Sequence, residues 1–131
     1  MNTYEYLLNK ASQMLLEAEI RLNTIKIQVQ ELDRQIALIR SFEAHLRENI
    51  AVLQRKRAIV VVHEFKKAKE DLQTAINRTA ILKLDRDKHF KIQVNYELVH
   101  QKAKFDYDKA FDKVWGEREN NVISVNFGRK L

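Results

Sequence analysis

The fold of this chain is decided by residues 8–53, LNKASQMLLEAEIRLNTIKIQVQELDRQIALIRSFEAHLRENIAVL. With Leu8 taken as position a of a heptad, the a and d positions of eight successive heptads are apolar except at Glu43 and Arg57. A helix cannot bury its own apolar stripe, so this pattern requires a second helix as a partner. It predicts an interaction seam made of Leu15, Leu22, Ile25, Val29, Leu32, Ile36, Ile39, Leu46, Ile50 and Leu53.

The composition also favours long helices over a compact sheet fold. The chain has 131 residues and no proline, and its only glycines are Gly116 and Gly128. Proline and glycine supply most of the turns that sheet-containing domains need. We therefore expect an all-α, elongated coiled coil with a narrow core, whose stability depends on contacts along the rod or with other subunits.

The regular heptads end at four consecutive β-branched residues, 59–62. Such residues are poor helix formers and good strand formers. They predict a bend near residues 55–70, which would fold residues 1–116 into an antiparallel helical hairpin. The alternative is a single helix that runs straight through, because aliphatic runs also occur in buried helices.

Helical periodicity returns between about residue 66 and Trp115, with a more polar seam. Further apolar side chains lie beside this seam or across from it, and a helix with so broad an apolar surface usually contacts more than one neighbour. The a positions are Leu72, Thr79, Arg86, Gln93, His100, Tyr107 and Val114, and the d positions are Ala75, Leu82, His89, Tyr96, Ala103 and Ala110.

Glu43 is a charged residue within the first seam. A buried charge is tolerated when it meets an opposite charge or fixes the register. In a hairpin that turns near residue 64, Glu43 would face Arg86 or Lys83. Alternatively, its side chain reaches outward to solvent.

The end of the chain has a different pattern from the helices. Gly116 is a typical residue just past a helix end, and it predicts a separate tail over residues 117–131. Within this tail, residues 122–127 alternate, with Ile123, Val125 and Phe127 on one face, which is a strand signal. Such a strand would either add to a sheet edge of another protein or be a frayed terminus.

The positive charge is concentrated in the middle of the chain. The net charge is +6, and residues 55–91 hold eleven Lys and Arg against five Asp and Glu. The densest part is a basic patch of Arg55, Lys56, Arg57, Lys66, Lys67 and Lys69. This patch would suit an acidic protein surface, an anionic lipid surface or nucleic-acid phosphates, or it is simply a solvated stretch of helix.

The sequence lacks the usual signatures of catalysis and of metal or cofactor binding. It has no cysteine, no glycine-rich phosphate loop and no serine in a glycine-bracketed turn. Its four histidines include no pair four residues apart, and Glu97-x-x-His100 stands alone where a di-iron bundle needs two such pairs. We therefore expect no enzyme activity, no catalytic residue, no cofactor and no metal.

The absence of a secretory signal pattern and of a long apolar run predicts a protein without a membrane span. We expect a location in the cytoplasm or within a viral or other macromolecular assembly. In general shape the predicted molecule is similar to small coiled-coil hairpins of bacterial export machines and phage particles.

These patterns together predict a non-enzymatic structural or assembly subunit. Such a subunit would pack through its coiled-coil seam into a homo-oligomer or a larger protein complex. One alternative is a protein that binds nucleic acid or an anionic surface through residues 55–69. The other is a helical chaperone or adaptor with an exposed apolar groove.

Overall fold

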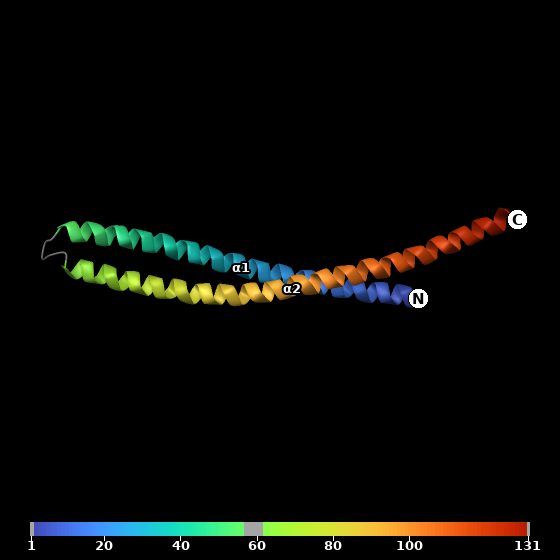
Figure 1. Cartoon of the computed structure of the whole chain (residues 1–131), viewed down its shortest axis with the longest axis horizontal. Coiled ribbons are helices and arrows are strands. Elements are labelled where there is room, and N and C mark those ends of the chain that lie inside the picture. The colour runs from blue at the N-terminus through green and yellow to red at the C-terminus, as the bar shows by residue number, and fades with distance from the viewer. Residues whose placement is uncertain (1, 57–61, 131) are drawn as a thin grey trace. The chain divides into compact units, whose positions relative to one another are not determined.

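The protein folds into two long α-helices (Figure 1). The computed structural model describes residues 2–56 and 62–130, and the side chains of residues 2–56 and 62–116. Helix α1 spans Thr3–Lys56 and helix α2 spans Val62–Lys130. The predicted all-α class and the helical hairpin are confirmed. Arg57 of the basic patch and residues 59–61 of the β-branched run lie outside the described residues.

Asn2 caps the start of α1. Its Oδ1 accepts a hydrogen bond of 2.8 Å from the backbone N–H of Glu5, and its backbone carbonyl accepts one of 3.1 Å from the N–H of Tyr6. An N-cap side chain satisfies a backbone donor that has no partner within the helix. At the other end, Arg55 and Lys56 occupy the last turn of α1, where positive charge offsets the negative end of the helix dipole.

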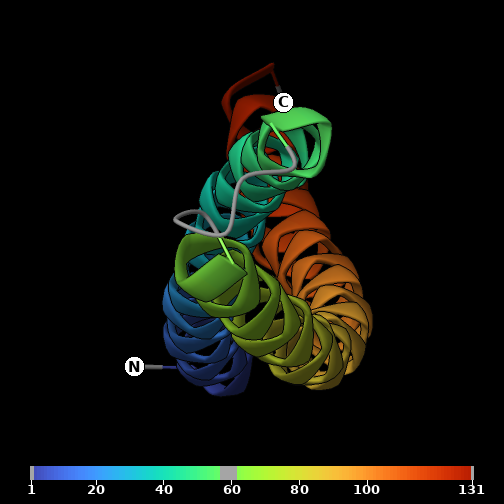
Figure 2. The ribbon, with the colours of Figure 1, turned by 90° about the vertical axis from the view of Figure 1, so that its left-hand side faces the viewer.

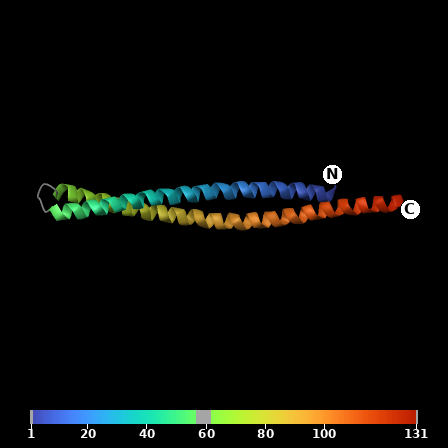
Figure 3. The ribbon, with the colours of Figure 1, turned by 90° about the horizontal axis from the view of Figure 1, so that it is seen from above.

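The chain divides into two compact units, each made from parts of both helices. One unit contains residues 25–91, which are the second half of α1 and the start of α2. In this hairpin unit the two helix segments run side by side in opposite directions (Figures 1 and 3). Its buried residues are Ile25, Val29, Ile36, Leu46, Leu53, Ala68, Ala75 and Thr79.

The other unit, which we call the terminal unit, contains residues 1–24 and 92–131. The beginning of α1 packs there against the later part of α2, and Ala18, Leu22, Ala103 and Val114 are buried. A contact of 3.5 Å between Glu19 Oε1 and His100 Nε2 joins the two segments. Among the described residues, no large side chain is fully buried in either unit. The core is therefore a single narrow layer between two helices.

The C-terminal residues differ from the prediction. The predicted strand over 122–127 is not found, because α2 continues through these residues to Lys130. The side chains of Ile123, Val125 and Phe127 lie outside the part that the structure describes. A lone strand leaves its backbone groups unpaired, and no strand is present among residues 2–56 and 62–130 to pair with it. A helix satisfies the same groups within the segment itself.

Gly116 does not end the second helix as predicted. It lies within α2, and apart from its chain neighbours and its own helix backbone no atom lies within 4 Å of the position that a Cβ would take. Glycine in a helix interior costs about 1 kcal/mol relative to alanine, which a long helix tolerates.

Candidate functional site

The interaction seam of α1 lies on the side of the helix that faces α2. Six of its ten residues are buried, at 5–8 % exposure: Leu22, Ile25, Val29, Ile36, Leu46 and Leu53. The other four are half-buried: Leu15, Leu32, Ile39 and Ile50. The apolar residues of this face are therefore largely used within the chain, and surfaces for other molecules must be sought elsewhere.

The polar residues of the two helices meet at specific points along the hairpin unit. The hydroxyl of Thr79, which is only 6 % exposed, donates a hydrogen bond of 2.6 Å to Glu43 Oε1. Arg86 Nε donates to Asp33 Oδ1 at 3.0 Å. The partner predicted for Glu43 was therefore wrong. Arg86 pairs with Asp33, and the partner of Glu43 is the uncharged hydroxyl of Thr79. Glu43 is nearer to the end of α1 than Asp33, and its partner Thr79 is nearer to the start of α2 than Arg86. Antiparallel helices require this order.

The described residues of the basic patch lie at the end of the hairpin unit where α1 ends and α2 begins, the end that faces the viewer in Figure 2. The side chains of Arg55, Lys56, Lys66, Lys67 and Lys69 are all exposed. Lys69 Nζ lies 4.6 Å from the centroid of the Phe65 ring, a cation–π contact. The hairpin thus brings two groups of cations, from different helices, to one end of the unit.

A second apolar face lies on α2 in the terminal unit, on the side away from α1. We call Val94, Leu98 and Phe105 the outer stripe; their exposures are 39 %, 60 % and 66 %. Spacings of four and seven residues place the three side chains on one face of a helix. Ala103 is buried at 8 %, and Tyr96, His100 and Tyr107 are half-buried, on the other face of the same segment. This part of α2 therefore carries exposed apolar side chains on the face opposite to the one that contacts α1.

An aromatic ladder follows the outer stripe along α2. The ring centroids of Tyr107 and Phe111 lie 6.2 Å apart, and those of Phe111 and Trp115 lie 6.4 Å apart, in stacked arrangements. Phe111 and Trp115 are 45 % and 54 % exposed. Large aromatic side chains are enriched at protein–protein contacts because they bury much area with few rotatable bonds.

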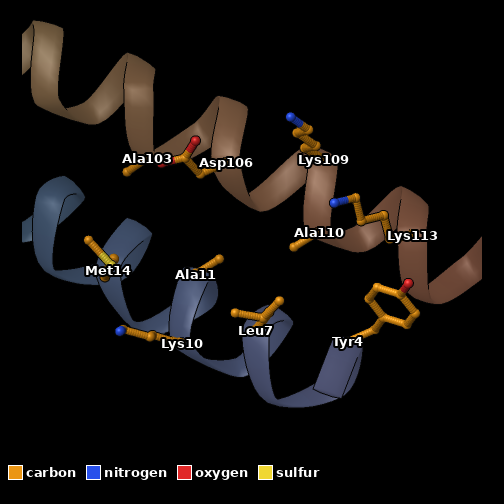
Figure 4. Close-up of a pocket in the computed structure, with 10 residues that line it drawn as sticks. All are labelled: Tyr4, Leu7, Lys10, Ala11, Met14, Ala103, Asp106, Lys109, Ala110 and Lys113. Carbon is orange, nitrogen blue, oxygen red and sulfur yellow. The ribbon is translucent and has the colours of Figure 1, made fainter. Parts of the chain in front are cut away.

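A groove runs between the helices of the terminal unit (Figure 4). It has a volume of about 290 Å³ and is lined by Tyr4, Leu7, Lys10, Ala11 and Met14 of α1 and by Ala103, Asp106, Lys109, Ala110 and Lys113 of α2. The sequence prediction missed this groove. The signal for it was the alanine at Ala11, Ala103 and Ala110, which are d positions of the two heptad patterns.

One histidine forms a local contact with an acidic residue of its own helix. His89 Nδ1 lies 2.8 Å from the carbonyl oxygen of Asp85 and 3.2 Å from its Oδ1, one helical turn away. Within the described part of the chain, no group of three or more histidines and carboxylates is placed to hold a metal ion. None of the helices described is both long enough and apolar enough to cross a bilayer.

Comparison with known protein families, with curated proteins and with solved structures finds no match for this chain.

Proposed function

We propose that this protein is a non-enzymatic structural or assembly subunit that packs, as a coiled coil, against copies of itself. The observation that carries this proposal is the outer stripe. After the hairpin has used the apolar seam of α1, Leu98 and Phe105 still lie 60 % and 66 % exposed on the far side of α2. Exposed apolar side chains that line one face of a helix are typically buried against a partner.

The narrow core supports the same proposal. Two helices form one layer of contacts, and none of the large side chains that the structure describes is fully buried. A packed domain usually gains its stability from a core in which residues contact neighbours on all sides. Additional helices against the outer stripe would supply the missing contacts.

The heptad pattern supports coiled-coil packing in particular. From Leu8 to Leu53 every a and d residue of α1 is buried or half-buried, and most residues between them are exposed. The same holds on α2 from Phe65 to Val114, when Leu72 is taken as position a. Burial at every a and d position is typical of helices that pack knobs into holes.

The experiment replaces Leu98 and Phe105 with lysine and measures the molar mass by light scattering after size exclusion. The unchanged chain should form an oligomer that persists at high salt, because apolar contacts are not screened. The double variant should have the mass of one chain, with its helicity by circular dichroism retained. A variant with lysine at the exposed polar residues Gln13 and Asn95 adds the same charge and should keep the oligomer. A monomeric unchanged chain at every concentration would contradict the proposal.

A second candidate function is binding to nucleic acid or another anionic surface, and the clustering of the basic patch favours it. Each phosphate contact releases counterions, so affinity should fall steeply between low and physiological salt. Replacing Arg55, Lys56 and Lys67 with glutamine should weaken such binding and reduce its salt dependence. Binding that is absent at low salt, or unchanged in this variant, would exclude the candidate.

A further inference from the structure

The groove of the terminal unit exists because alanines face each other across the helix pair. Ala11 on α1 and Ala103 and Ala110 on α2 occupy positions where coiled coils usually carry leucine or isoleucine. A methyl group cannot fill the space that a leucine side chain occupies. The result is an open trough, not an enclosed cavity, between Leu7, Ala11 and Met14 of α1 and Ala103 and Ala110 of α2 (Figure 4).

The lining of the groove has the length of a short helix. On each helix its lining covers about three turns, from Tyr4 to Met14 and from Ala103 to Lys113. Exposed apolar side chains belong to its wall: Tyr4, Leu7 and Met14 are 42 %, 43 % and 53 % exposed. A third helix lying along such a trough could place apolar side chains at helical spacing into it.

The rim of the groove is cationic. Of the residues that line the groove, Lys10, Lys109 and Lys113 are positively charged and Asp106 is negatively charged. All four side chains are exposed. Within the described residues none of the three lysines forms an ion pair. Their charges are therefore available to a partner, and charge complementarity selects one that is acidic.

We propose that this groove binds an amphipathic helix of another protein, one with a short apolar row flanked by acidic residues. A second copy of this chain fits less well, because the chain carries a net charge of +6 and its residues 1–54 hold six basic residues against seven acidic ones. The proposal concerns a different surface from the outer stripe, so it does not depend on self-assembly.

The test uses the full chain and two synthetic helical peptides, each about three heptads long with leucine at a and d. One peptide has glutamate at e and g, and its matched control has lysine there. Fluorescence anisotropy measures the binding of each labelled peptide. The acidic peptide should bind at least about tenfold more tightly than the basic one, a difference of about 1.4 kcal/mol. Equal affinities, or no binding of the acidic peptide, would overturn the proposal.

Two variants locate the binding in the groove. Ala110→Leu fills the trough and should abolish binding while the melting temperature stays the same or rises. Lys109→Glu reverses one rim charge and should weaken the binding of the acidic peptide severalfold. Lys104→Glu reverses a charge outside the groove and should have no such effect. If Ala110→Leu fails to fold, the affinities of Lys109→Glu and Lys104→Glu for the acidic peptide decide whether the peptide binds in the groove.

A third variant separates this proposal from self-assembly. The lysine substitutions at Leu98 and Phe105 should leave peptide binding unchanged, because these residues do not line the groove. If they abolish peptide binding, the peptide occupies the outer stripe and the groove proposal fails. A chain that is monomeric but still binds the acidic peptide would instead contradict only the proposed self-assembly.

Discussion

At the scale of single residues, the contact between Thr79 and Glu43 is the most informative feature of the hairpin. The sequence indicated that Glu43 was a charge in an apolar seam, but it could not indicate an uncharged partner. Charge matching favoured Arg86 or Lys83, whereas the structure supplies a buried hydroxyl at 2.6 Å. A threonine at a seam position is a weak signal, because hydroxyl groups can bond to many acceptors.

Removing this hydroxyl should destabilise the hairpin unit. Thr79→Val keeps the shape of the side chain but leaves the part-buried carboxylate of Glu43 without its donor, which should cost about 1–3 kcal/mol. Chemical denaturation of the full chain measures the change, with Thr79→Ser as the control that keeps the hydroxyl. Adding Glu43→Leu to Thr79→Val should recover most of the loss, because the buried polar group is then gone. A Thr79→Val variant as stable as Thr79→Ser would show that the contact contributes nothing.

Glu31 gives a second prediction at this scale. Its oxygens accept hydrogen bonds of 2.6 and 2.9 Å from Arg34 and one of 3.3 Å from Gln35. These bonds, with Arg34 the larger cause, lower the pKa of Glu31 to about 2. Any stability that depends on this carboxylate is fully present above its usual pKa of about 4.3 and is lost as the pH falls through about 2.

Carbon NMR of the side-chain carboxyl measures this titration directly. The Glu31 signal should titrate near pH 2 in the unchanged chain. Arg34→Gln should move its midpoint up towards about 4.3, the usual pKa of glutamate, whereas Arg40→Gln should leave it in place. A Glu31 midpoint that is the same in all three proteins would mean that the side-chain pairing does not form in solution.

At the scale of elements, the sequence predicted helices correctly and the ends of helices poorly. The heptads from Leu8 to Leu53 follow from one repeated physical requirement, an apolar residue every three or four positions, and α1 spans Thr3–Lys56 as this pattern demands. The tail offered only six alternating residues and one glycine. A strand signal of that length depends on a partner strand, which local sequence does not reveal.

Gly116 tests this interpretation of α2. If the helix runs through this residue, Gly116→Ala should stabilise the chain by about 0.5–1 kcal/mol, because alanine restricts the unfolded chain and no atom obstructs its Cβ. Thermal unfolding followed by circular dichroism measures the effect. Gly116→Asn is the control, because asparagine is favourable just after a helix end and less favourable than alanine within a helix. Stabilisation by Asn with destabilisation by Ala would instead place a helix end at Gly116, as the sequence suggested.

The groove also belongs to this scale, and the reason it was missed is physical. Each alanine by itself is an ordinary helix residue. Only when α1 and α2 are brought together do Ala11 and Ala110 line the same space. A groove between two helices depends on which residues face each other, and a heptad pattern read along one helix does not give that register.

At the scale of the whole molecule, the chain covers the apolar seam of α1 with its own α2, and we propose that it assembles through what remains exposed. The all-α hairpin could be predicted because the long seam needs a second helix and the chain contains one. The sequence predicted assembly through the seam of α1, but that seam is largely buried within the chain. The outer stripe of Val94, Leu98 and Phe105 becomes a candidate contact surface only once the other face of α2 is occupied.

The packing of α1 against α2 within one chain is tested most directly by cross-linking between introduced cysteines, which the chain permits because it has none of its own. Cysteines at Glu43 and Thr79, whose side chains touch, should be joined rapidly by a short thiol-reactive cross-linker. The product should have the mass of one chain. A control pair at Glu43 and Lys91 is displaced by about 18 Å along α2 and should react slowly. Cross-links that form only between two chains, or equally fast in the control, would contradict the account.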